Sequence, residues 1–369
     1  MALGSNQGEK LQWLQKAVDR IFEKIGKVTA ISSVYKTPAL GFEGDDFLNA
    51  CVEVKTWYSA EKTLGKLLEI ETSLGRVRDK NGYQNRNIDL DLIFFGNECL
   101  NSKKLVVPHP KMAERKFVLE PLAEISAEVV HPLKNKSVSE LLEQTSDVSE
   151  VEKIPERLKM PQLDFSNYHY ISIEGNIGAG KTSFAHMIAE DLPAGKAGFN
   201  AKLLLEGFKN NPFLPKFYEE PKRYAFPLEM SFLADRYQQL SDEIGQYNLF
   251  LDFVVADYEV SKSLIFAEIT LQEEEFSLYK KLFALMHKNL TKPDLYIYLY
   301  QNTDRLLENI KTRGRDYEQN IQADYLEKIN RGYLNFIKNH PEMNIKIIDV
   351  SELDFVNRRE DYLKVLREI

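Results

Sequence analysis

Apolar segments with two different periods follow one another along the first part of the chain. Residues 10–25 and 59–75 carry apolar side chains at i, i+3, i+4 and i+7, which predicts two amphipathic helices. Segments rich in β-branched and aromatic residues predict strands at 32–37, 49–57 and 87–95. This half of the chain therefore predicts a mixed domain of short strands and helices.

A different alternation begins near residue 168. Apolar runs separated by helical sequence occur at 168–175, 201–206, 249–257, 294–300 and 344–350. This pattern is typical of a buried parallel sheet in an α/β domain. The sequence near 145–168 holds two prolines and many charges with little periodicity, which predicts a linker. We therefore divide the chain into a domain at 1–155, a linker at 156–167 and a domain at 168–369.

Composition places the chain among globular proteins. It has 369 residues, of which 43% are hydrophobic, and this length is sufficient for two cores. The net charge of −8 argues against broad electrostatic capture of nucleic acid or anionic membranes. Two cysteines are too few for a disulfide scaffold, and no apolar run resembles a membrane span or a signal peptide. We expect a cytoplasmic protein with neither nucleic acid nor membrane as a partner.

The strongest motif is GNIGAGKT, which matches the phosphate-loop pattern GxxxxGK[ST] between a predicted strand and a predicted helix. Its glycines let backbone N–H groups converge on phosphate oxygens, and the helix N-terminus adds positive potential. Lys181 would reach the β- and γ-phosphates of ATP, and the Thr182 hydroxyl would coordinate Mg²⁺. The motif as a whole assigns ATP binding to Gly175, Asn176, Ile177, Gly178, Ala179, Gly180, Lys181 and Thr182.

A phosphate loop alone leaves three classes open: a small-molecule kinase, a GTPase and an ATPase motor. TKPD at 291–294 matches a guanine-reading motif weakly and precedes a strand, which disfavours a GTPase. A kinase needs a base for the acceptor hydroxyl and cations over the transferring group. Glu206 at the end of a strand is a candidate base, and Arg313 and Arg315 in TRGRDYEQNI are candidate cations.

From about residue 167 to the end, the sequence resembles the deoxyribonucleoside kinase family. The matching text is the phosphate loop, Glu206, FYEEPKRYAFPLEMSFLADRYQQL, RGRDYEQNI and DYLEKINRGY. The resemblance implies transfer of the ATP γ-phosphoryl group to a deoxynucleoside 5′-hydroxyl, with Glu206 as the base and Arg313 and Arg315 as lid arginines. It implies substrate binding by Tyr218 and Glu318 at the sugar 3′-hydroxyl, by Phe266 stacked on the base, and by Glu229 and Arg236.

Two positions depart from that family. An acidic-Arg-Ser triad usually follows the third strand, whereas this chain has Asp257, Tyr258 and Glu259. The phosphate-contacting arginine is therefore missing, and we hypothesise that Lys262 supplies the cation. Asp257 remains a candidate partner for Mg²⁺ or the base. Many members have a glutamine at Glu229; an ionised glutamate only accepts hydrogen bonds, which suits the guanine N1–H and N2–H₂ donors and favours purine deoxynucleosides.

In the first domain, Asp89 and Asp91 lie two residues apart in RNIDLDLIFF, so a strand would point both carboxylates to one face. Adjacent carboxylates repel unless they share cations, and Mg²⁺ with a polyphosphate is a suitable ligand. A solvent-facing strand with alternating acids is an equal alternative from spacing alone. Basic side chains around this segment favour a magnesium–triphosphate site, and they are Arg76, Arg86, His109 and Arg115.

Residues 2 to about 150 resemble the hydroxymethyldihydropterin pyrophosphokinase family of folate synthesis. The motifs LGSNQG, VYKTPALG, DDFLNA, IETSLGRVR, NRNIDLDLIFFG and VPHPKMAERKFVLEPLAEI occur in the family's order. The resemblance implies a ferredoxin-like α+β fold, pyrophosphoryl transfer from ATP to the pterin hydroxymethyl oxygen, and two magnesium ligands, Asp89 and Asp91. It implies phosphate contacts for Arg76, Arg86, His109 and Arg115, with the two former catalytic. It implies pterin contacts for Thr37, Pro38, Leu40, Phe47, Asn49 and Phe117.

Together these observations predict a bifunctional kinase of two domains, a ferredoxin-like α+β domain and an α/β P-loop kinase domain with a parallel sheet. Both sites would use Mg²⁺ and ATP, with two ions in the first site and one in the second. By family analogy we expect a homodimer formed through the C-terminal domain. The alternative is that only the N-terminal domain is catalytic and the C-terminal domain is an oligomerisation or regulatory module, because Tyr258 replaces an arginine.

Overall fold

The structure is a computed structural model of the chain. It describes residues 1–369 except 40–43, 77–84, 162, 164, 166, 192–200, 209–210, 246–252 and 289. The chain forms two compact units, Met1–Pro161 and Gln162–Ile369. The division falls within the segment 156–167 that the sequence indicates as a linker. No helix in the described part of the chain is long and apolar enough to cross a membrane.

The N-terminal unit is built on one antiparallel sheet with the order β10-β3-β4-β1-β5, and β2 also pairs with β4. Its strands are β1 (Ala2–Ser5), β2 (Lys27–Ile31), β3 (Tyr35–Thr37), β4 (Phe47–Lys55), β5 (Asp89–Asp91) and β10 (Glu152–Lys153). Two short hairpins are formed by β6 (Leu100–Asn101) with β7 (Val106–Val107), and by β8 (Val130–His131) with β9 (Lys136–Ser137). The helices are α1 (Lys10–Lys24), α2 (Ala60–Ser73), η1 (Met112–Glu114), α3 (Lys116–Ser126) and α4 (Val138–Gln144).

Two features of this unit differ in extent from the sequence pattern. The strand predicted at 87–95 forms only at β5, because β1 offers it only the partners Ala2, Leu3 and Gly4. At the other end, the unit continues beyond residue 155, where the first domain was expected to end. The Lys159 N–H donates to Gln15 Oε1 (2.7 Å) and the Gln15 amide donates to the Lys159 carbonyl (3.1 Å), which ties this segment to α1.

The C-terminal unit contains the parallel sheet that the sequence predicts, with the order β12-β13-β11-β14-β15. Its strands are β11 (Tyr170–Gly175), β12 (Ala201–Leu204), β13 (Phe253–Ala256), β14 (Leu295–Tyr300) and β15 (Ile345–Asp349). Its helices are α5 (Lys181–Asp191), α6 (Leu214–Glu219), α7 (Pro221–Gly245), α8 (Lys262–Thr270), α9 (Glu273–His287), α10 (Thr303–Arg313), η2 (Asp316–Glu318), α11 (Ala323–Asn339) and α12 (Arg359–Arg367).

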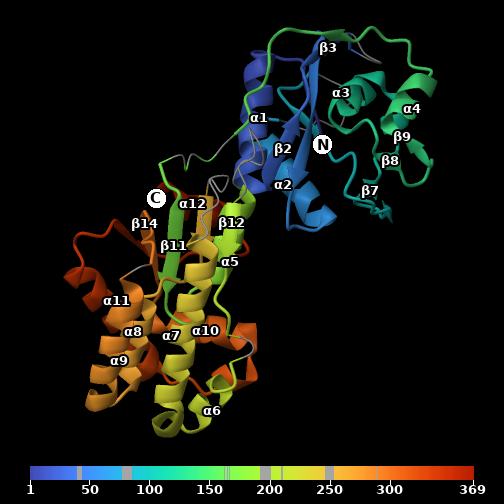
Figure 1. Ribbon diagram of the computed structural model, residues 1–369. Helices are drawn as coiled ribbons and strands as arrows, with labels where there is room; N and C mark the ends of the chain where they lie inside the picture. Colours follow the sequence, from blue (N-terminus) through green and yellow to red (C-terminus); the bar gives the residue numbers. More distant parts are fainter. Residues whose placement is uncertain are drawn as a thin grey trace. The chain divides into compact units, whose positions relative to one another are not determined.

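The arrangement of this unit places loops from several strands at one edge. Because all five strands run parallel, the carboxyl ends of β11, β12 and β13 lie at the same end of the sheet, where ligands of α/β proteins bind. Helices α7, α8 and α9 pack side by side below that edge (Figure 1). The site residues that follow each strand are therefore brought together against side chains of these helices.

Candidate active sites

In the N-terminal unit, a cavity of about 530 Å³ opens beside β1, β4 and β5. It gathers side chains that the sequence analysis selected from distant parts of the chain. These residues are Thr37, Pro38, Phe47, Asn49, Arg76, Arg86, Asp89, Asp91, His109, Arg115 and Phe117. Leu40, the remaining predicted pterin contact, lies outside the described residues. The cavity also includes Lys111 and Glu114, which the sequence analysis did not select.

The paired acids face this cavity. Arg76 Nη1 lies 2.5 Å from one Asp89 oxygen, and Arg86 Nη1 lies 2.9 Å from the other. Burial and the charge of Asp89 raise the pKa of Asp91, while Arg115, Arg86 and Arg76 act against the shift. Of the two interpretations of the spacing, the cavity geometry favours the cation site. No cluster of three or more acidic, histidine or cysteine side chains that could hold a metal ion was found among the described residues. Two carboxylates nevertheless suit Mg²⁺ when phosphates complete its shell.

A buried glutamate, to which the sequence analysis gave no role, forms hydrogen bonds with β5 and with Arg76. Glu71, on α2, is only 1% exposed. Its Oε1 accepts the Leu90 N–H at 2.8 Å and a hydrogen bond from the Arg76 guanidinium. Glu71 therefore fixes both the backbone between the two acids and the first arginine. The sequence feature that could have indicated this role is an acidic residue in an amphipathic helix just before a Gly-Arg loop.

The same cavity also carries aromatic and amide groups. The Asn49 amide nitrogen donates to Thr37 Oγ1 at 2.8 Å. The Arg86 guanidinium lies 5.5 Å from the centre of the Phe47 ring, and that of Arg115 lies 5.6 Å from Phe117. Each ring therefore has a cation beside it. These groups can hold a flat, polar heterocycle next to the arginines.

In the C-terminal unit, the phosphate loop connects β11 to α5. Gly178 and Gly180 have φ of +85° and +84°, a conformation that a side chain at either position would strain. Lys181 Nζ donates to the carbonyls of Gly175 (3.0 Å) and Asn176 (2.9 Å). A cavity of about 1300 Å³ is lined by the continuous segment from Gly178 to Thr182.

The first three residues of the motif, Gly175, Asn176 and Ile177, do not line this cavity. Asn176 is fully buried, and its amide donates to the Leu326 carbonyl at 2.7 Å and to Asn330 Oδ1 at 2.8 Å. Its side chain therefore joins the loop to α11 instead of facing the nucleotide space. Gly175 and Asn176 do not line the large cavity, whereas Ile177 lines a smaller, adjoining one, which we call the acceptor cavity.

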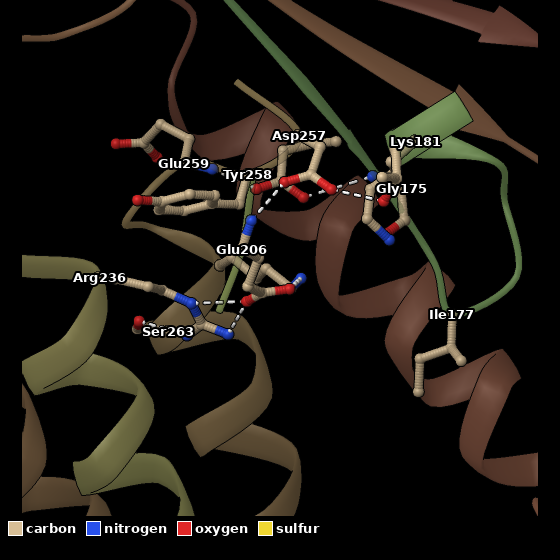
Figure 2. A network of polar contacts seen from close by, with 12 residues as sticks. Gly175, Ile177, Lys181, Glu206, Arg236, Asp257, Tyr258, Glu259 and Ser263 are labelled. Carbon is tan, nitrogen blue, oxygen red and sulfur yellow. Dashed lines mark hydrogen bonds and ion pairs between the residues drawn. The ribbon is translucent and has the colours of Figure 1, made fainter. Parts of the chain in front are cut away.

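Glu206 follows β12 and lies at the centre of a charged cluster (Figure 2). Its Oε1 accepts from Arg236 Nε at 2.8 Å and Nη2 at 2.5 Å, and its Oε2 lies 2.6 Å from Lys262 Nζ. Burial alone would raise the pKa of Glu206, but Lys262 and Arg236 outweigh burial and hold the pKa far below its usual range. The carboxylate is therefore ionised and held by two cations from α7 and α8.

Asp257 joins this cluster to the phosphate loop. One of its oxygens accepts from Thr182 Oγ1 at 2.5 Å, and the other accepts the Glu206 N–H at 2.7 Å. The hydroxyl and carboxylate that P-loop kinases use near Mg²⁺ are thus adjacent, and the donor set fits that ion. Burial and then the charge of Lys262 lower the pKa of Lys181 to about 8, so these two cations act on the same space.

Tyr258 makes its side-chain hydrogen bond with α7. Its side chain is fully buried, and its hydroxyl donates to Gln239 Oε1 at 2.8 Å. In Figure 2 the ring extends away from Lys181. The structure brings Lys262, not residue 258, to the candidate base.

The acceptor cavity collects the remaining predicted substrate residues. Arg315 Nη1 lies 3.1 Å from Glu318, which also binds Arg313. Burial is the largest cause of the raised pKa of Tyr218, and the charge of Glu318 is the second. Tyr317, which the sequence analysis did not select, stacks on Tyr218 with ring centres 5.9 Å apart. The predicted residues that line this cavity are Glu206, Tyr218, Glu229, Arg236, Phe266, Arg313, Arg315 and Glu318.

A second buried glutamate escaped the sequence analysis. Glu174 precedes the phosphate loop and is completely buried, with its oxygens accepting from the Glu259 N–H (2.6 Å) and the Tyr333 hydroxyl (2.8 Å). It therefore ties the loop after β13, which leads to Lys262, to the start of the phosphate loop and to α11. The signal was an acid at the end of an otherwise apolar buried strand.

Burial raises the pKa of Glu174 from 4.5 to about 7. Because the pKa of Glu174 is higher in the folded state, its protonation contributes to the stability of the fold. This contribution is complete below pH 4.5 and is lost as the pH rises through 7. We expect the free energy of unfolding of the C-terminal unit to fall between pH 5 and pH 8, and to fall by roughly 2 to 3 kcal/mol less in Glu174→Gln. Amide hydrogen exchange of β14, corrected for intrinsic rates, measures this difference. An identical pH dependence in both proteins would contradict it.

Comparisons with known proteins match each unit separately. A profile described as deoxynucleoside kinase matches residues 171–369, and one described as 7,8-dihydro-6-hydroxymethylpterin-pyrophosphokinase matches residues 1–127. The chain is 37% identical to deoxyguanosine kinase of Bacillus subtilis strain 168 over 204 residues, covering 54% of this chain and 95% of that protein. It is 41% identical to the 2-amino-4-hydroxy-6-hydroxymethyldihydropteridine pyrophosphokinase of the same strain over 131 residues, covering 35% and 78%. A solved structure of deoxyadenosine kinase from M. mycoides with bound dATP aligns with a TM-score of 0.45 and 25% identity, covering 54% of this chain and all of that one.

Proposed function

The chain belongs to the deoxynucleoside kinase family through its C-terminal unit and to the hydroxymethyldihydropterin pyrophosphokinase family through its N-terminal unit, and from this premise we propose how each site acts. The protein is a bifunctional kinase and hence a transferase. The N-terminal site transfers a pyrophosphoryl group from ATP to 6-hydroxymethyl-7,8-dihydropterin. The C-terminal site transfers the γ-phosphoryl group of ATP to a deoxynucleoside.

In the N-terminal site, Phe47 and Phe117 hold the pterin ring between them and Asn49 reads its edge. The hydroxymethyl oxygen loses its proton to solvent and forms a bond to the β-phosphorus of ATP as the bond between that phosphorus and the α–β bridging oxygen breaks, and AMP leaves with that bridging oxygen. Arg76 and Arg86 stabilise the charge that develops on the transferred group. The observation that supports this assignment is the cavity that joins the carboxylates of Asp89 and Asp91 to three arginines and two aromatic rings.

In the C-terminal site, Glu206 accepts the proton of the 5′-hydroxyl as its oxygen bonds to the γ-phosphorus, and ADP leaves with the β–γ bridging oxygen. Lys181, Arg313 and Arg315 stabilise the equatorial oxygens of the transferring group. Tyr218 and Glu318 orient the sugar. The observation that supports this assignment is Glu206, partly buried close to the phosphate loop and held by two cations.

Several finer features belong to the same proposal. Asp89 and Asp91 would hold two Mg²⁺ ions and Thr182 one, whose chemistry is to neutralise phosphate charge. His109 and Arg115 contact ATP phosphates. The antiparallel sheet of the N-terminal unit supports a ferredoxin-like fold. We further propose a cytoplasmic homodimer, formed through the C-terminal unit, that serves folate synthesis and nucleoside salvage with a preference for purines.

The nucleotide released from ATP tests both assignments in one protein. A pyrophosphoryl transfer leaves AMP and a phosphoryl transfer leaves ADP. We expect AMP only when hydroxymethyldihydropterin is added and ADP only when a deoxynucleoside is added, with release measured by chromatography. AMP without ADP would identify the C-terminal unit as a non-catalytic module, as the alternative from the sequence holds.

A further inference from the structure

Glu229 occupies an unusual position in the acceptor cavity. Its side chain is 3% exposed and lines the cavity from α7, opposite Phe266 on α8. Its Oε1 lies 3.0 Å from Thr270 Oγ1 at the end of α8. Thr270 supplies the side-chain hydrogen bond to this carboxyl group among the described residues. A carboxyl group in a ligand cavity has further lone pairs that can contact the ligand.

The Thr270 hydroxyl has two hydrogen-bond partners and one hydrogen. Its oxygen also lies 2.9 Å from the carbonyl of Phe266, one helical turn earlier. When the hydrogen points to Glu229, the carboxyl oxygen accepts it, as an ionised carboxylate does. When the hydrogen points to Phe266, the contact with Glu229 remains a hydrogen bond only if the carboxyl group is protonated and donates. Thr270 can therefore partner Glu229 in both protonation states.

The surroundings of Glu229 allow both the carboxylate and the carboxylic acid to be populated near neutral pH. Burial raises the pKa of Glu229 to about 7, against the effect of nearby cations. Arg236 lies two turns along the same helix, and the Tyr279 hydroxyl donates to the Glu229 carbonyl at 3.3 Å. The titratable groups that interact with this carboxyl group from the surrounding elements are Glu206, Tyr218, Arg236, Lys262, Tyr279 and Tyr325.

We propose that Glu229 and Thr270 form an adjustable hydrogen-bonding pair that reads the base of the acceptor, with the carboxylate selecting guanine and the carboxylic acid selecting adenine. A carboxylate offers two acceptors and matches the adjacent N1–H and N2–H₂ donors of guanine. When adenine binds, the Thr270 hydrogen turns to Oε1 of the carboxylic acid. The acid's own hydrogen, on Oε2, is then free to be donated to adenine N1, while Oε1 also accepts from N6–H₂. The mismatched base leaves a buried polar group unpaired, which lowers its kcat/KM. This inference rests on the proposed deoxynucleoside kinase activity.

The ratio of kcat/KM for deoxyguanosine to that for deoxyadenosine tests the pair directly. Because kcat/KM reports the free enzyme, the ratio follows the balance of carboxylate to carboxylic acid, and effects of pH on the shared chemistry cancel. We expect the ratio to rise at least fivefold between pH 6 and pH 8, where neither base titrates. If each protonation state accepted only one base, the ratio would rise tenfold per pH unit. A smaller rise than fivefold overturns the proposal.

Three variants separate this reading from other causes of pH dependence. In Glu229→Gln the amide offers a donor and an acceptor at every pH, so we expect a ratio that is independent of pH and shifted towards deoxyadenosine. Thr270→Val removes a hydrogen bond that lowers the pKa of Glu229, so the carboxylic acid persists to higher pH and we expect a ratio below that of the wild type at pH 7. Asp242→Asn, the same change of charge at an exposed position of α7, should keep the wild-type ratio. A Glu229→Gln ratio that still rises with pH refutes the pair. Absence of ADP with every deoxynucleoside would instead refute the proposed activity.

Discussion

Replacing Lys262 with alanine is expected to lower kcat for deoxynucleoside phosphorylation about 100-fold, the usual scale for one preorganised charge in a transition state. Lys262 Nζ lies 2.6 Å from Glu206, is almost completely buried, and lowers the pKa of Lys181 through its charge. It is therefore placed to stabilise the transferring phosphoryl group in the role that the sequence leaves open at Tyr258. The measurement is deoxynucleoside-dependent ADP release at saturating ATP.

Three comparisons isolate the charge of this residue. Lys262→Arg keeps the charge and should retain most of kcat. Lys281→Ala removes a lysine from the exposed side of α9 and should leave kcat within twofold of the wild type. Pterin-dependent AMP release by Lys262→Ala serves as an internal standard, since it depends on the other unit. A kcat within threefold of the wild type would show that Lys262 does not replace the missing arginine.

The parts of the C-terminal site that the sequence predicted are those encoded locally. The phosphate loop is continuous in sequence, and its spacing alone places Lys181 at the start of a helix after a buried strand. Glu206 ends an apolar run, so its place at the edge of a parallel sheet followed from topology. The absence of an arginine at Tyr258 was equally visible. These features needed no knowledge of which helix packs against which strand.

The partners that orient these groups were not predictable in the same way. Glu174 and Tyr333 are 159 residues apart, and Asn176 binds α11 across 150 residues. Neither hydrogen bond has a sequence signature, because each depends on how α11 docks on the sheet. Thr270 is an ordinary helix-terminal residue until α7 places Glu229 beside it. Long-range packing, not local pattern, determines which buried polar groups find partners.

The N-terminal unit shows the same contrast between features that local sequence predicts and features that packing determines. The spacing of Asp89 and Asp91 predicted a shared face but could not choose between solvent and a cation site. Basic residues elsewhere in the sequence favoured the cation site. The fold adds the contacts of Arg76 and Arg86 with Asp89, which the sequence could not show. It also adds Glu71, which binds Arg76 and accepts the Leu90 N–H. The length of β5 also depends on its neighbouring strand, since pairing with β1 limits β5 to three residues.

Replacing Asp91 with asparagine is expected to lower pterin-dependent AMP release about 1000-fold while deoxynucleoside-dependent ADP release stays unchanged. The substitution preserves shape and removes one of the two charges that would hold magnesium with the ATP phosphates. Asp19→Asn, on α1, is the matched control and should stay within twofold of the wild type. An AMP rate for Asp91→Asn within tenfold of the wild type would contradict the cation site.

Stability distinguishes a functional carboxylate from a structural one in the same variant. Burial and then the charge of Asp89 raise the pKa of Asp91, so the ionised pair destabilises the metal-free fold. Asp91→Asn should therefore shift the urea midpoint of the N-terminal unit upwards in the absence of Mg²⁺, even as activity is lost. Both tryptophans of the chain, Trp13 and Trp57, lie in this unit, so tryptophan fluorescence follows its unfolding selectively. A lower midpoint would mean that Asp91 supports the fold, and its loss of activity would then report damage to β5 instead of loss of a magnesium ligand.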